Sequence, residues 1–374
     1  MYKAQFNPEW YSSEAYYFKE WDNLFSKVWL FAGFNNRLRG NGSYFVIELF
    51  GKEIVVHDFN GEIKAYQNAC PHRGGPFYLD KDGKGFPSCL YHGWTFENAK
   101  DLSFISHHDW FSEDCSEDSC ARQLNYLRVQ LIGPCIFVSF DLDGIDISDQ
   151  FSDEVLDTLR GLGELSDLGV FEYESKINWK LNMENVKDFL HPFYIHPSSF
   201  KPLLNFEAPR GSKLSNFGDD SSLKPFDVSQ SLQDLSYVNW ADLSIDGQWW
   251  ASKINMTQPD DRYINIFLFP STNLYSVSGG FYGAQQYLPK SATTFNYVLS
   301  AAIPSKKEDF STSALLQTIL KLERDVINED DLILNKVQKN LSSGLKDDFF
   351  AQGDYEHRLM AQMSYLNKHV YRLK

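Results

Sequence analysis

The sequence predicts an α+β protein in which a small all-β domain precedes a larger domain of mixed strands and helices. Short strand-like runs separated by turn signals fill residues 41–142, a pattern typical of an all-β domain. Beyond them, strand-like runs alternate with helical patterns, and the chain from about Asp309 keeps apolar residues at helical spacing. With 374 residues, the chain is long enough for two domains that each bury a core.

Composition and charge argue against several classes of function. Hydrophobic residues make up 43% of the chain and no apolar run reaches the roughly 18 residues of a membrane helix, so we expect a soluble globular protein without a membrane partner. The net charge of −15 argues against nucleic acid as a partner. The first residues lack a basic stretch followed by an apolar one, which predicts no signal peptide and a cytoplasmic location. A disulfide scaffold is therefore not expected from the five cysteines.

Residues 1–40 are expected to form a helical segment that packs on the larger domain. Ser12 or Ser13 is the predicted N-cap, and Glu14 suits the first turn of a helix. Apolar side chains then recur at helical spacing, namely Tyr17, Trp21, Leu24, Phe25 and Val28. We interpret this face as a packing surface.

From about Asn41 the hydrophobic period becomes that of strands. The runs YFVIELF, EIVVHDF and EIKAYQNA predict three strands, and Asn60-Gly61 between the last two is a strong hairpin signal. His57 lies on one of these strands and is interpreted as an ordinary strand residue. The run DKDGKG is expected to be a polar turn, DLDGIDISDQ a linker, and residues 205–240 a long mobile loop over the site or between subunits.

Two mixed cysteine–histidine pairs stand out in the all-β region. Cys70 and His72 form a C-x-H step, and Cys89 and His92 form a C-x-x-H step. Two thiolates and two imidazoles can hold a single zinc, or a 2Fe–2S cluster in which two histidines replace cysteines on one iron. The cluster is favoured because zinc fingers usually separate their cysteines from their histidines, and because glycines that permit close backbone approach follow the histidines, namely Gly74, Gly75 and Gly93.

A second group of candidate ligands lies in the run ENVKDFLHPFYIH. Asp188 and His191 are three residues apart and are expected to share a helix face. His196 falls about 140° further round an ideal helix, but Pro192 and Pro197 disturb the helix, so that a distorted end can aim both imidazoles at one ion. Two histidines and one carboxylate form the facial triad of non-haem Fe(II) oxygenases, although two nearby histidines alone are a weak signal.

These motifs resemble those of the Rieske non-haem iron oxygenases, the family of the aromatic-ring-hydroxylating dioxygenase α subunits. C-P-H-R-G and C-x-Y-H-G-W are similar to the cluster loops of its oxygenase branch, because Gly75 and Tyr91 stand where the respiratory branch carries a disulfide. N-W-K followed by E-N-x-x-D-x-x-H-x-x-x-x-H resembles its catalytic domain, with Leu190 where many members carry Tyr. The length suits the single-component α-type members.

The resemblance implies a role for each candidate residue. It implies one 2Fe–2S cluster per chain, bound by Cys70, His72, Cys89 and His92. It also implies one Fe2+ per chain, bound by His191, His196 and the aspartate of a late E-D step, which is Asp330 here, with the adjacent Asp331 as the alternative. Asp188 is implied not to be a ligand but to link the iron with a cluster histidine of the neighbouring subunit, and Asn185 is implied to lie near the iron.

The resemblance also implies a fold and a division of the chain. It implies a catalytic domain over residues 143–374 of the helix-grip (START-like) type, in which an antiparallel sheet wraps round a long helix. It implies a Rieske domain over residues 41–142 and an N-terminal segment, 1–40, that packs on the catalytic domain.

The implied function is that of a terminal oxygenase component. A separate reductase of the flavin or ferredoxin type passes electrons from NAD(P)H to the cluster, and a homotrimer uses O2 to hydroxylate, dihydroxylate or demethylate a small organic substrate. Two alternatives stay open on the residues alone. One is an electron carrier without oxygenase activity, and the other is a zinc-stabilised binding module.

The substrate class is open at the level of sequence. The stretch V-Q-x-N-L-x-S-G at Val337–Gly344 loosely resembles that of family members acting on choline, betaine and other quaternary ammonium compounds. An aromatic cage for a cation is available from Trp240, Trp249, Trp250, Tyr275 and Tyr282. An aromatic acid or a polycyclic compound is an equally open alternative.

Overall fold

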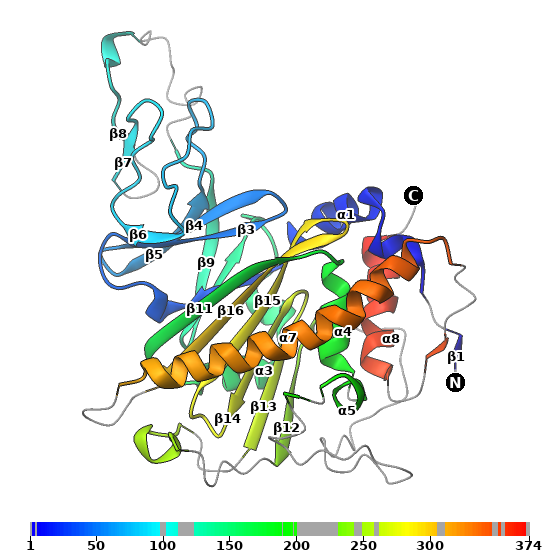
Figure 1. The fold of residues 1–374 in the computed structure, drawn as a ribbon. Coiled ribbons are helices and arrows are strands. Elements are labelled where there is room, and N and C mark those ends of the chain that lie inside the picture. The colour runs from blue at the N-terminus through cyan, green and yellow to red at the C-terminus, as the bar shows by residue number, and fades with distance from the viewer. Residues whose placement is uncertain are drawn as a thin grey trace.

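Two antiparallel sheets organise the molecule (Figure 1). The structure is a computed structural model that describes residues 2–3, 6–97, 102–110, 123–188, 190–196, 198–199, 231–242, 249–257, 262–304, 311–345, 351–352 and 356–371. The first sheet has seven strands in the order β2-β10-β9-β5-β4-β3-β6, and the second has six in the order β11-β16-β15-β14-β13-β12. Helices flank the second sheet, so the predicted α+β class is confirmed.

The first sheet contains the region predicted to be all-β. Its β4–β5 connection turns at Asn60-Gly61, whose φ angles of 55° and 88° lie in the left-handed region that a two-residue hairpin turn requires, so the predicted hairpin is confirmed. The strands are β2 (Leu30–Phe34), β3 (Ser43–Leu49), β4 (Lys52–Phe59), β5 (Glu62–Gln67), β6 (Asp82–Lys84), β9 (Tyr126–Ile132) and β10 (Cys135–Ser139). A separate small pair is formed by β7 (Thr95–Phe96) and β8 (Leu102–Phe104).

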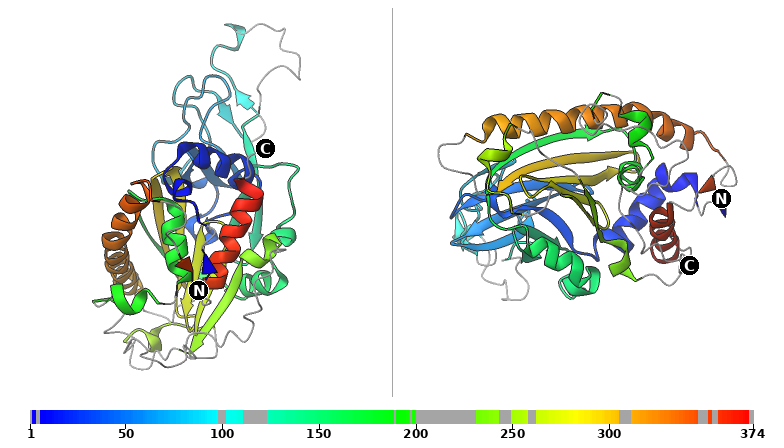
Figure 2. Two further views of the ribbon diagram at one scale, coloured as in Figure 1. Left: turned by 90° about the vertical axis from the view of Figure 1, so that its right-hand side faces the viewer. Right: turned by 90° about the horizontal axis from the view of Figure 1, so that it is seen from below.

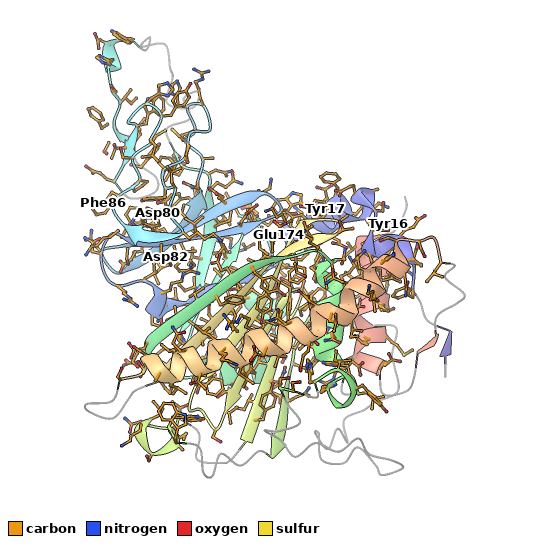
Figure 3. The ribbon with its side chains drawn as sticks, in the orientation of Figure 1. Tyr16, Tyr17, Asp80, Asp82, Phe86 and Glu174 are labelled. Carbon is orange, nitrogen blue, oxygen red and sulfur yellow. The ribbon has the colours of Figure 1, made fainter. Side chains whose placement is uncertain are left out.

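The run DKDGKG, predicted to be a polar turn, instead contains the exposed strand β6, which pairs with β3. No hydrophobic alternation could indicate it, because its side chains face solvent. Its position is explained by the buried Arg37, which donates to both carboxylate oxygens of Asp82 at 2.6 and 2.9 Å and lies 3.7 Å from Glu172 of β11. These charges join the two sheets along the boundary where Figure 3 shows Asp82 and Glu174.

The second sheet lies between helices on both faces (Figure 2). One face is apolar and packs on α3 (Asp153–Arg160), which Ser152 caps by accepting from the Val155 amide at 3.4 Å. The other face meets α7 (Ser313–Leu341), a helix of 29 residues that crosses the sheet, so the predicted helix-grip arrangement is confirmed. The strands are β11 (Leu165–Ser175), β12 (Tyr237–Asp242), β13 (Arg262–Leu268), β14 (Thr272–Val277), β15 (Tyr282–Ser291) and β16 (Thr294–Pro304).

The remaining elements connect the termini to this frame. The helix α1 (Glu14–Glu20) begins directly after Ser13, as predicted, and β2 shows that the segment 1–40 also supplies an edge strand to the first sheet. The other elements are α2 (Ile147–Gln150), α4 (Trp179–Lys187), α5 (Pro192–Ile195), α8 (His357–Tyr365), β1 (Tyr2–Lys3) paired with β17 (Ala351–Gln352), 3-10 turns at Pro8–Tyr11, Asn35–Arg37, His108–Trp110, Leu232–Leu235 and Ala251–Lys253, and π turns at Trp21–Phe25 and Leu366–Val370. No described helix combines the length and apolar character needed to cross a membrane.

The loop predicted at residues 205–240 is wrong at its C-terminal end. Residues 201–230 lie outside the described residues, but Leu232–Leu235 forms a 3-10 turn and Tyr237–Asp242 forms the edge strand β12, which pairs with β13. The strand was missed because it is short and because the polar stretch before it has no hydrophobic pattern that marks where a strand begins.

A fully buried ion pair holds the N-terminal segment to α4. The Lys180 ammonium lies 2.5 Å from Oε1 of Glu20, and both side chains are almost completely inaccessible. The Trp179 indole donates to Oε2 of Glu20 at 2.8 Å, and the Tyr371 hydroxyl also donates to this carboxylate. One carboxylate therefore ties together α1, α4 and the end of the chain.

Replacing Glu20 by Ala is expected to lower the free energy of unfolding by about 3–5 kcal/mol, because a buried ammonium loses its partner. Urea denaturation measures this loss. The matched control is Asp325→Ala, which removes the exposed pair between Lys321 and Asp325 and should leave the midpoint almost unchanged. Equal effects of the two substitutions would contradict the stabilising role of the buried pair.

Candidate metal centres

The two cysteine–histidine loops repeat one backbone conformation. The amide of Gly74 donates to the carbonyl of Cys70 at 2.8 Å, and the amide of Gly93 donates to the carbonyl of Cys89 at 2.8 Å. Both glycines have a φ angle of 72°, which non-glycine residues rarely adopt. The two loops therefore present their cysteines and histidines in matching ways, beside β7 in the part of the first domain that projects away from the second sheet.

The side chains of these loops fit a two-iron cluster better than a single zinc ion. The Cys70 and Cys89 thiols lie close enough to interact, and the His72 and His92 rings lie 4.7 Å apart between centroids, so the four donors fall into a cysteine pair and a histidine pair. In a 2Fe–2S cluster with histidine ligands, two cysteines bind one iron and two histidines bind the other, which matches this pairing.

The surroundings of the loop donors also suit a cluster. Cys70 and Cys89 are buried, and burial, followed by the nearby Cys89 thiol, raises the pKa of Cys70 to about 11, although backbone amides of the loop oppose the shift. The rings of His72 and His92 lie 4.7 Å apart between centroids. Within the described part of the chain, the buried Nδ1 of His92 has no hydrogen-bond partner, as a free ligand atom requires. Trp94 stacks on His72 at 4.8 Å.

Close contact between the loops explains why Gly75 carries no side chain. A Cβ at Gly75 would lie 2.8 Å from Cβ of Tyr91 and 3.0 Å from Sγ of Cys89. The guanidinium of Arg73 lies 5.6 Å from the Tyr91 ring, and that ring is exposed. Arg73, Tyr91 and Trp94 thus flank the loops, and the exposed Tyr91 ring leaves one side of the loops accessible to another protein surface.

The second candidate centre lies where α4 ends. The helix stops at Lys187, and Asp188 has extended backbone angles, φ −86° and ψ 116°. The prediction that Asp188 and His191 share a helix face is therefore wrong, because the chain leaves the helix before His191 and starts the short helix α5 at Pro192. This break, which the prolines indicate, is what turns both imidazoles toward α7.

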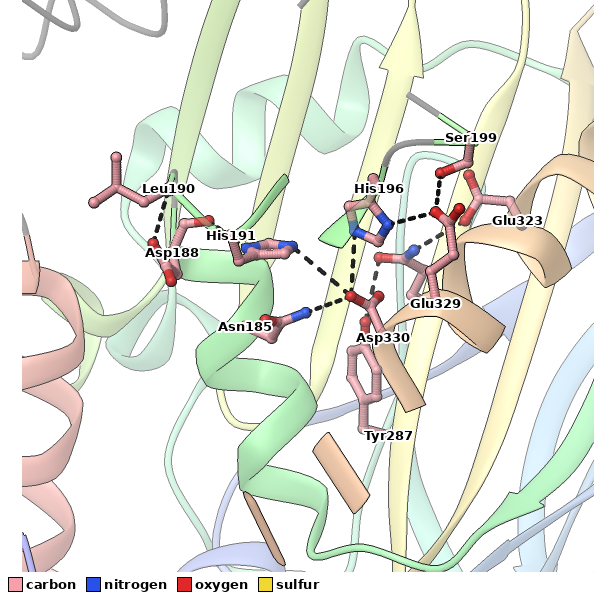
Figure 4. A network of polar contacts seen from close by, with 11 residues as sticks. Asn185, Asp188, Leu190, His191, His196, Ser199, Tyr287, Glu323, Glu329 and Asp330 are labelled. Atoms are coloured by element: carbon pink, nitrogen blue, oxygen red, sulfur yellow. Dashed lines mark hydrogen bonds and ion pairs between the residues drawn. The ribbon is translucent and has the colours of Figure 1, made fainter. Parts of the chain in front are cut away.

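Two imidazoles and one carboxylate converge at this break (Figure 4). Nε2 of His196 lies 3.2 Å, and Nε2 of His191 lies 3.9 Å, from Oδ1 of Asp330 on α7. All three donor atoms lie within 4.8 Å of one another. This donor set and spacing suit one non-haem ferrous ion with positions left open for other ligands.

Hydrogen bonds on the far side of each ring orient the two imidazoles. Nδ1 of His191 donates to the backbone carbonyl of Asp188 at 2.7 Å, and Nδ1 of His196 donates to Oε2 of Glu329 at 3.0 Å. Both Nε2 atoms are thereby left as the lone-pair donors. Burial lowers the pKa of His191, which favours the neutral form that binds a metal.

The structure distinguishes the two adjacent aspartates of α7. Oδ1 of Asp330 accepts from the Asn185 amide at 2.8 Å and faces the histidines. Asp331 instead accepts from the Tyr173 hydroxyl at 3.0 Å and the Ser175 hydroxyl at 3.3 Å, so it points toward β11. Asp330, Asn185, His191 and His196 are therefore brought together, and Asp331 is turned away.

Glu329 is a site residue that the sequence analysis did not single out. Besides His196, its carboxylate accepts from the Ser199 hydroxyl at 2.6 Å and the Ser198 amide at 3.1 Å, which ties the chain after α5 to α7. The E-D step was the only signal for it, and an acidic pair on a helix is usually a solvated face.

Replacing Glu329 by Gln is expected to weaken ferrous-iron binding by about 10–100-fold, because the ring of His196 loses the carboxylate that orients it. Titration of the iron-depleted protein with Fe2+ measures the change. The matched control is Asp325→Asn, which alters an exposed acid one turn earlier on α7 and should leave the affinity unchanged. An unchanged affinity in Glu329→Gln would contradict the orienting role.

The aromatic cage considered for a cation is not formed by the five residues named for it. Trp250 and Tyr275 share one core cluster, but Tyr282 packs in the cluster on the opposite face of the sheet. Trp249 is half exposed, and the side chain of Trp240 lies outside the described residues. Alternation along the strands places Tyr275 and Tyr282 on opposite faces, which composition alone does not reveal.

Together, a cluster-type loop pair in one domain and a His–His–Asp site in the other define a two-centre redox metalloenzyme. The description "ring hydroxylating alpha subunit (catalytic domain)" matches residues 162–370, and "Rieske [2Fe-2S] domain" matches residues 28–107. The chain belongs to this family of Rieske oxygenases, which are oxidoreductases whose two domains imply a 2Fe–2S cluster and a non-haem iron.

Relatives with known activities differ in what they oxidise. The chain is 24% identical to the terephthalate 1,2-dioxygenase terminal oxygenase component subunit alpha 2 of Comamonas sp, over 72% of this chain and 68% of the relative. It is 23% identical to the carnitine monooxygenase oxygenase subunit of Escherichia coli (strain K12), over 89% and 83%.

Solved structures of two Rieske oxygenases share the fold. A quaternary ammonium Rieske monooxygenase superimposes with a TM-score of 0.73 at 19% identity, covering 97% of this chain and 95% of the other. Naphthalene 1,2-dioxygenase with indole bound superimposes with a TM-score of 0.68 at 18% identity, covering 96% and 91%. At these identities the likeness concerns the fold.

Proposed function

We propose that this chain is a terminal oxygenase component that uses O2 and externally supplied electrons to oxidise a small organic substrate. The observation that carries the proposal is the convergence of three donor atoms within 4.8 Å in a chain that also has the paired Rieske loops. The proposed cluster ligands are Cys70, His72, Cys89 and His92, and the proposed iron ligands are His191, His196 and Asp330. The chemistry supplied by a ferrous ion at such a site is activation of O2, fed by electrons stored in the cluster.

The protein side chains have distinct proposed tasks in this reaction. Glu329 and the Asp188 carbonyl hold the imidazoles in the tautomer that binds a metal. Asn185 donates to Asp330 and positions the carboxylate. We propose that the partly exposed Asp188 side chain meets a cluster histidine of a neighbouring subunit and so connects the two centres.

A bridge between subunits is supported by the distance between the two centres within one chain. Figure 1 places β7, which follows the second cluster loop, and α5, which carries the iron-site segment, at opposite ends of the molecule. Direct transfer within one chain is therefore unfavourable, and we propose a homotrimer in which the cluster of one subunit serves the iron of the next. Three further points stay predictions. They are the division of the chain into residues 1–40, 41–142 and 143–374, a flavin- or ferredoxin-type reductase that uses NAD(P)H, and a cytoplasmic location.

Oxygen incorporation tests the proposed function directly. The protein is reduced with dithionite without air, mixed with a panel of ammonium compounds and aromatic acids, and exposed to isotopically labelled O2. Labelled oxygen in an organic product, or in formaldehyde released by demethylation, is the expected result. Consumption of electrons without labelled product from any compound would favour an electron carrier.

A further inference from the structure

A buried glutamate lies on the same face of α7 as Asp330. Glu323 precedes Asp330 by seven residues, which is two helical turns or about 10 Å along the axis. Its side chain is 6% exposed, and its Oε2 accepts from the Gln285 amide at 3.0 Å. Figure 4 shows Glu323 in one view with His196 and Asp330, and the charges of these two residues act on its carboxyl group. The mechanism proposed above does not use this carboxylate.

Glu323 has no lysine or arginine partner among the described residues. Its carboxylate accepts a hydrogen bond from the neutral Gln285 amide, and the nearby charges that act on it are those of His196 and Asp330. Burial accordingly raises the pKa of this carboxyl group. Buried carboxylates in proteins are normally paired with a cation or a metal, so a further cation placed beside Glu323 would be stabilised by its carboxylate.

Two pairs of tyrosines from the helix-facing side of the sheet surround this group. Tyr263 and Tyr275 stack with centroids 6.3 Å apart, and Tyr287 and Tyr297 meet edge to face at 5.4 Å. Burial raises the pKa of all four phenols, and the charge of Glu323 raises it further in each. Aromatic faces and one carboxylate are the groups that bind organic cations in proteins.

Several polar atoms of this region have unused hydrogen-bonding capacity. Within the described part of the chain, the buried hydroxyls of Tyr275 and Tyr297 and the buried Oδ1 of Asn273 have no hydrogen-bond partner. The Tyr275 hydroxyl lies near the Glu323 carboxylate, which adds to the effect of burial in raising the pKa of the phenol, but the two groups do not form a hydrogen bond of normal geometry. Buried polar groups are rarely left unsatisfied unless a ligand or water completes them.

We propose that Glu323 and the tyrosines around it bind the cationic group of the substrate, and that the substrate is therefore an organic ammonium compound. This assignment rests on the proposed function and names its substrate class. Glu323 supplies the countercharge, the tyrosine faces supply cation–π contact, and Gln285 holds the carboxylate in place. With its cationic group at Glu323, the substrate would be oxidised at another carbon atom, the one that lies beside His191, His196 and Asp330.

Binding of two probes of equal shape and different charge tests the assignment. Choline and its neutral carbon isostere 3,3-dimethylbutan-1-ol are titrated separately into the iron-loaded protein by calorimetry, with benzoate as an anionic probe. We expect choline to bind about tenfold or more tightly than the isostere, in line with the energy of a desolvated cation–π site. Benzoate should bind more weakly than both.

Substitution of Glu323 tests whether this residue causes the preference for choline over its neutral isostere. Glu323→Gln keeps the acceptor for Gln285 and removes the charge, so the preference for choline should fall to nearly one, whereas Glu323→Asp should retain part of it. The matched control is Glu184→Gln, which neutralises a partly buried glutamate on α4 that accepts from the Tyr11 hydroxyl at 2.6 Å, and it should retain the full preference.

Each outcome decides the assignment. Equal binding of the two isosteres to the wild-type protein, or tighter binding of benzoate, overturns it even if no variant folds. A full choline preference in Glu323→Gln also overturns it. If these results occur while labelled O2 is still incorporated into another substrate, the ammonium assignment fails and the oxygenase function stands.

Discussion

Replacing Asp330 by Asn is expected to remove the mononuclear iron and to abolish oxygen incorporation, while the visible spectrum of the cluster stays unchanged. Asp330 is the one anionic donor among the three converging residues, and the variant leaves two neutral imidazoles. Loss of a residue that only hydrogen-bonds a metal ligand lowers metal affinity by up to about 100-fold. Because Asp330 is itself a proposed ligand, we expect a larger loss of iron affinity. Iron analysis of the purified variant should fall from about three to about two irons per chain.

The adjacent aspartate provides the matched control. Asp331→Asn changes the same kind of group one residue further along α7, but its side chain bonds to Tyr173 and Ser175 on β11. This variant should keep about three irons per chain and its oxygenase activity. If Asp331→Asn lost the iron and Asp330→Asn kept it, the ligand assignment would have to be reversed.

Replacing Asp188 by Asn is expected to keep both metal centres and to lower steady-state turnover by about 100-fold or more, the upper end of the effect of groups behind a metal ligand. The iron should remain, because His191 bonds to the backbone carbonyl of Asp188, which the substitution leaves in place. The lost negative charge is the one we assign to the contact with the next subunit. Turnover with a surrogate reductase and iron content, measured on one preparation, separate the two effects.

Mixing two inactive variants tests whether electrons cross between subunits. Cys89→Ser chains should lack a cluster but keep Asp188, and Asp188→Asn chains should keep a cluster. Co-refolded or co-expressed mixtures should regain part of the activity that neither variant has alone, because some neighbours combine an intact cluster with an intact Asp188. Full activity in Asp188→Asn alone would refute the bridge.

The loops of the first centre could be recognised from the sequence, and a Rieske domain is matched over the residues that contain them. The spacing of Cys70, His72, Cys89 and His92 and the glycines that follow them are local features, and each loop is a short turn closed by its own backbone bonds. What the pattern left open was zinc against a two-iron cluster. That choice depends on how the folded loops pair cysteine with cysteine and histidine with histidine, which is a tertiary property.

The second centre could be predicted only in part. The two histidines could be identified as candidate ligands from the sequence. The prediction that Asp188 and His191 share a helix face was wrong, because α4 ends at Lys187 and Asp188 has extended backbone angles. Asp330 came from a family resemblance, since on residues alone an acidic run on α7 reads as a solvated face. Glu323 and Asp330 do interrupt the apolar stripe of α7 at a spacing of seven, which was an available signal.

Counting iron in the purified protein and recording visible and EPR spectra after anaerobic reduction with dithionite test the two-centre assignment most directly. We expect about three irons per chain and a rhombic EPR signal from a reduced cluster with histidine ligands. A cluster signal with only about two irons per reconstituted chain would leave an electron carrier and contradict the iron site at His191, His196 and Asp330. A colourless protein containing zinc would contradict both centres.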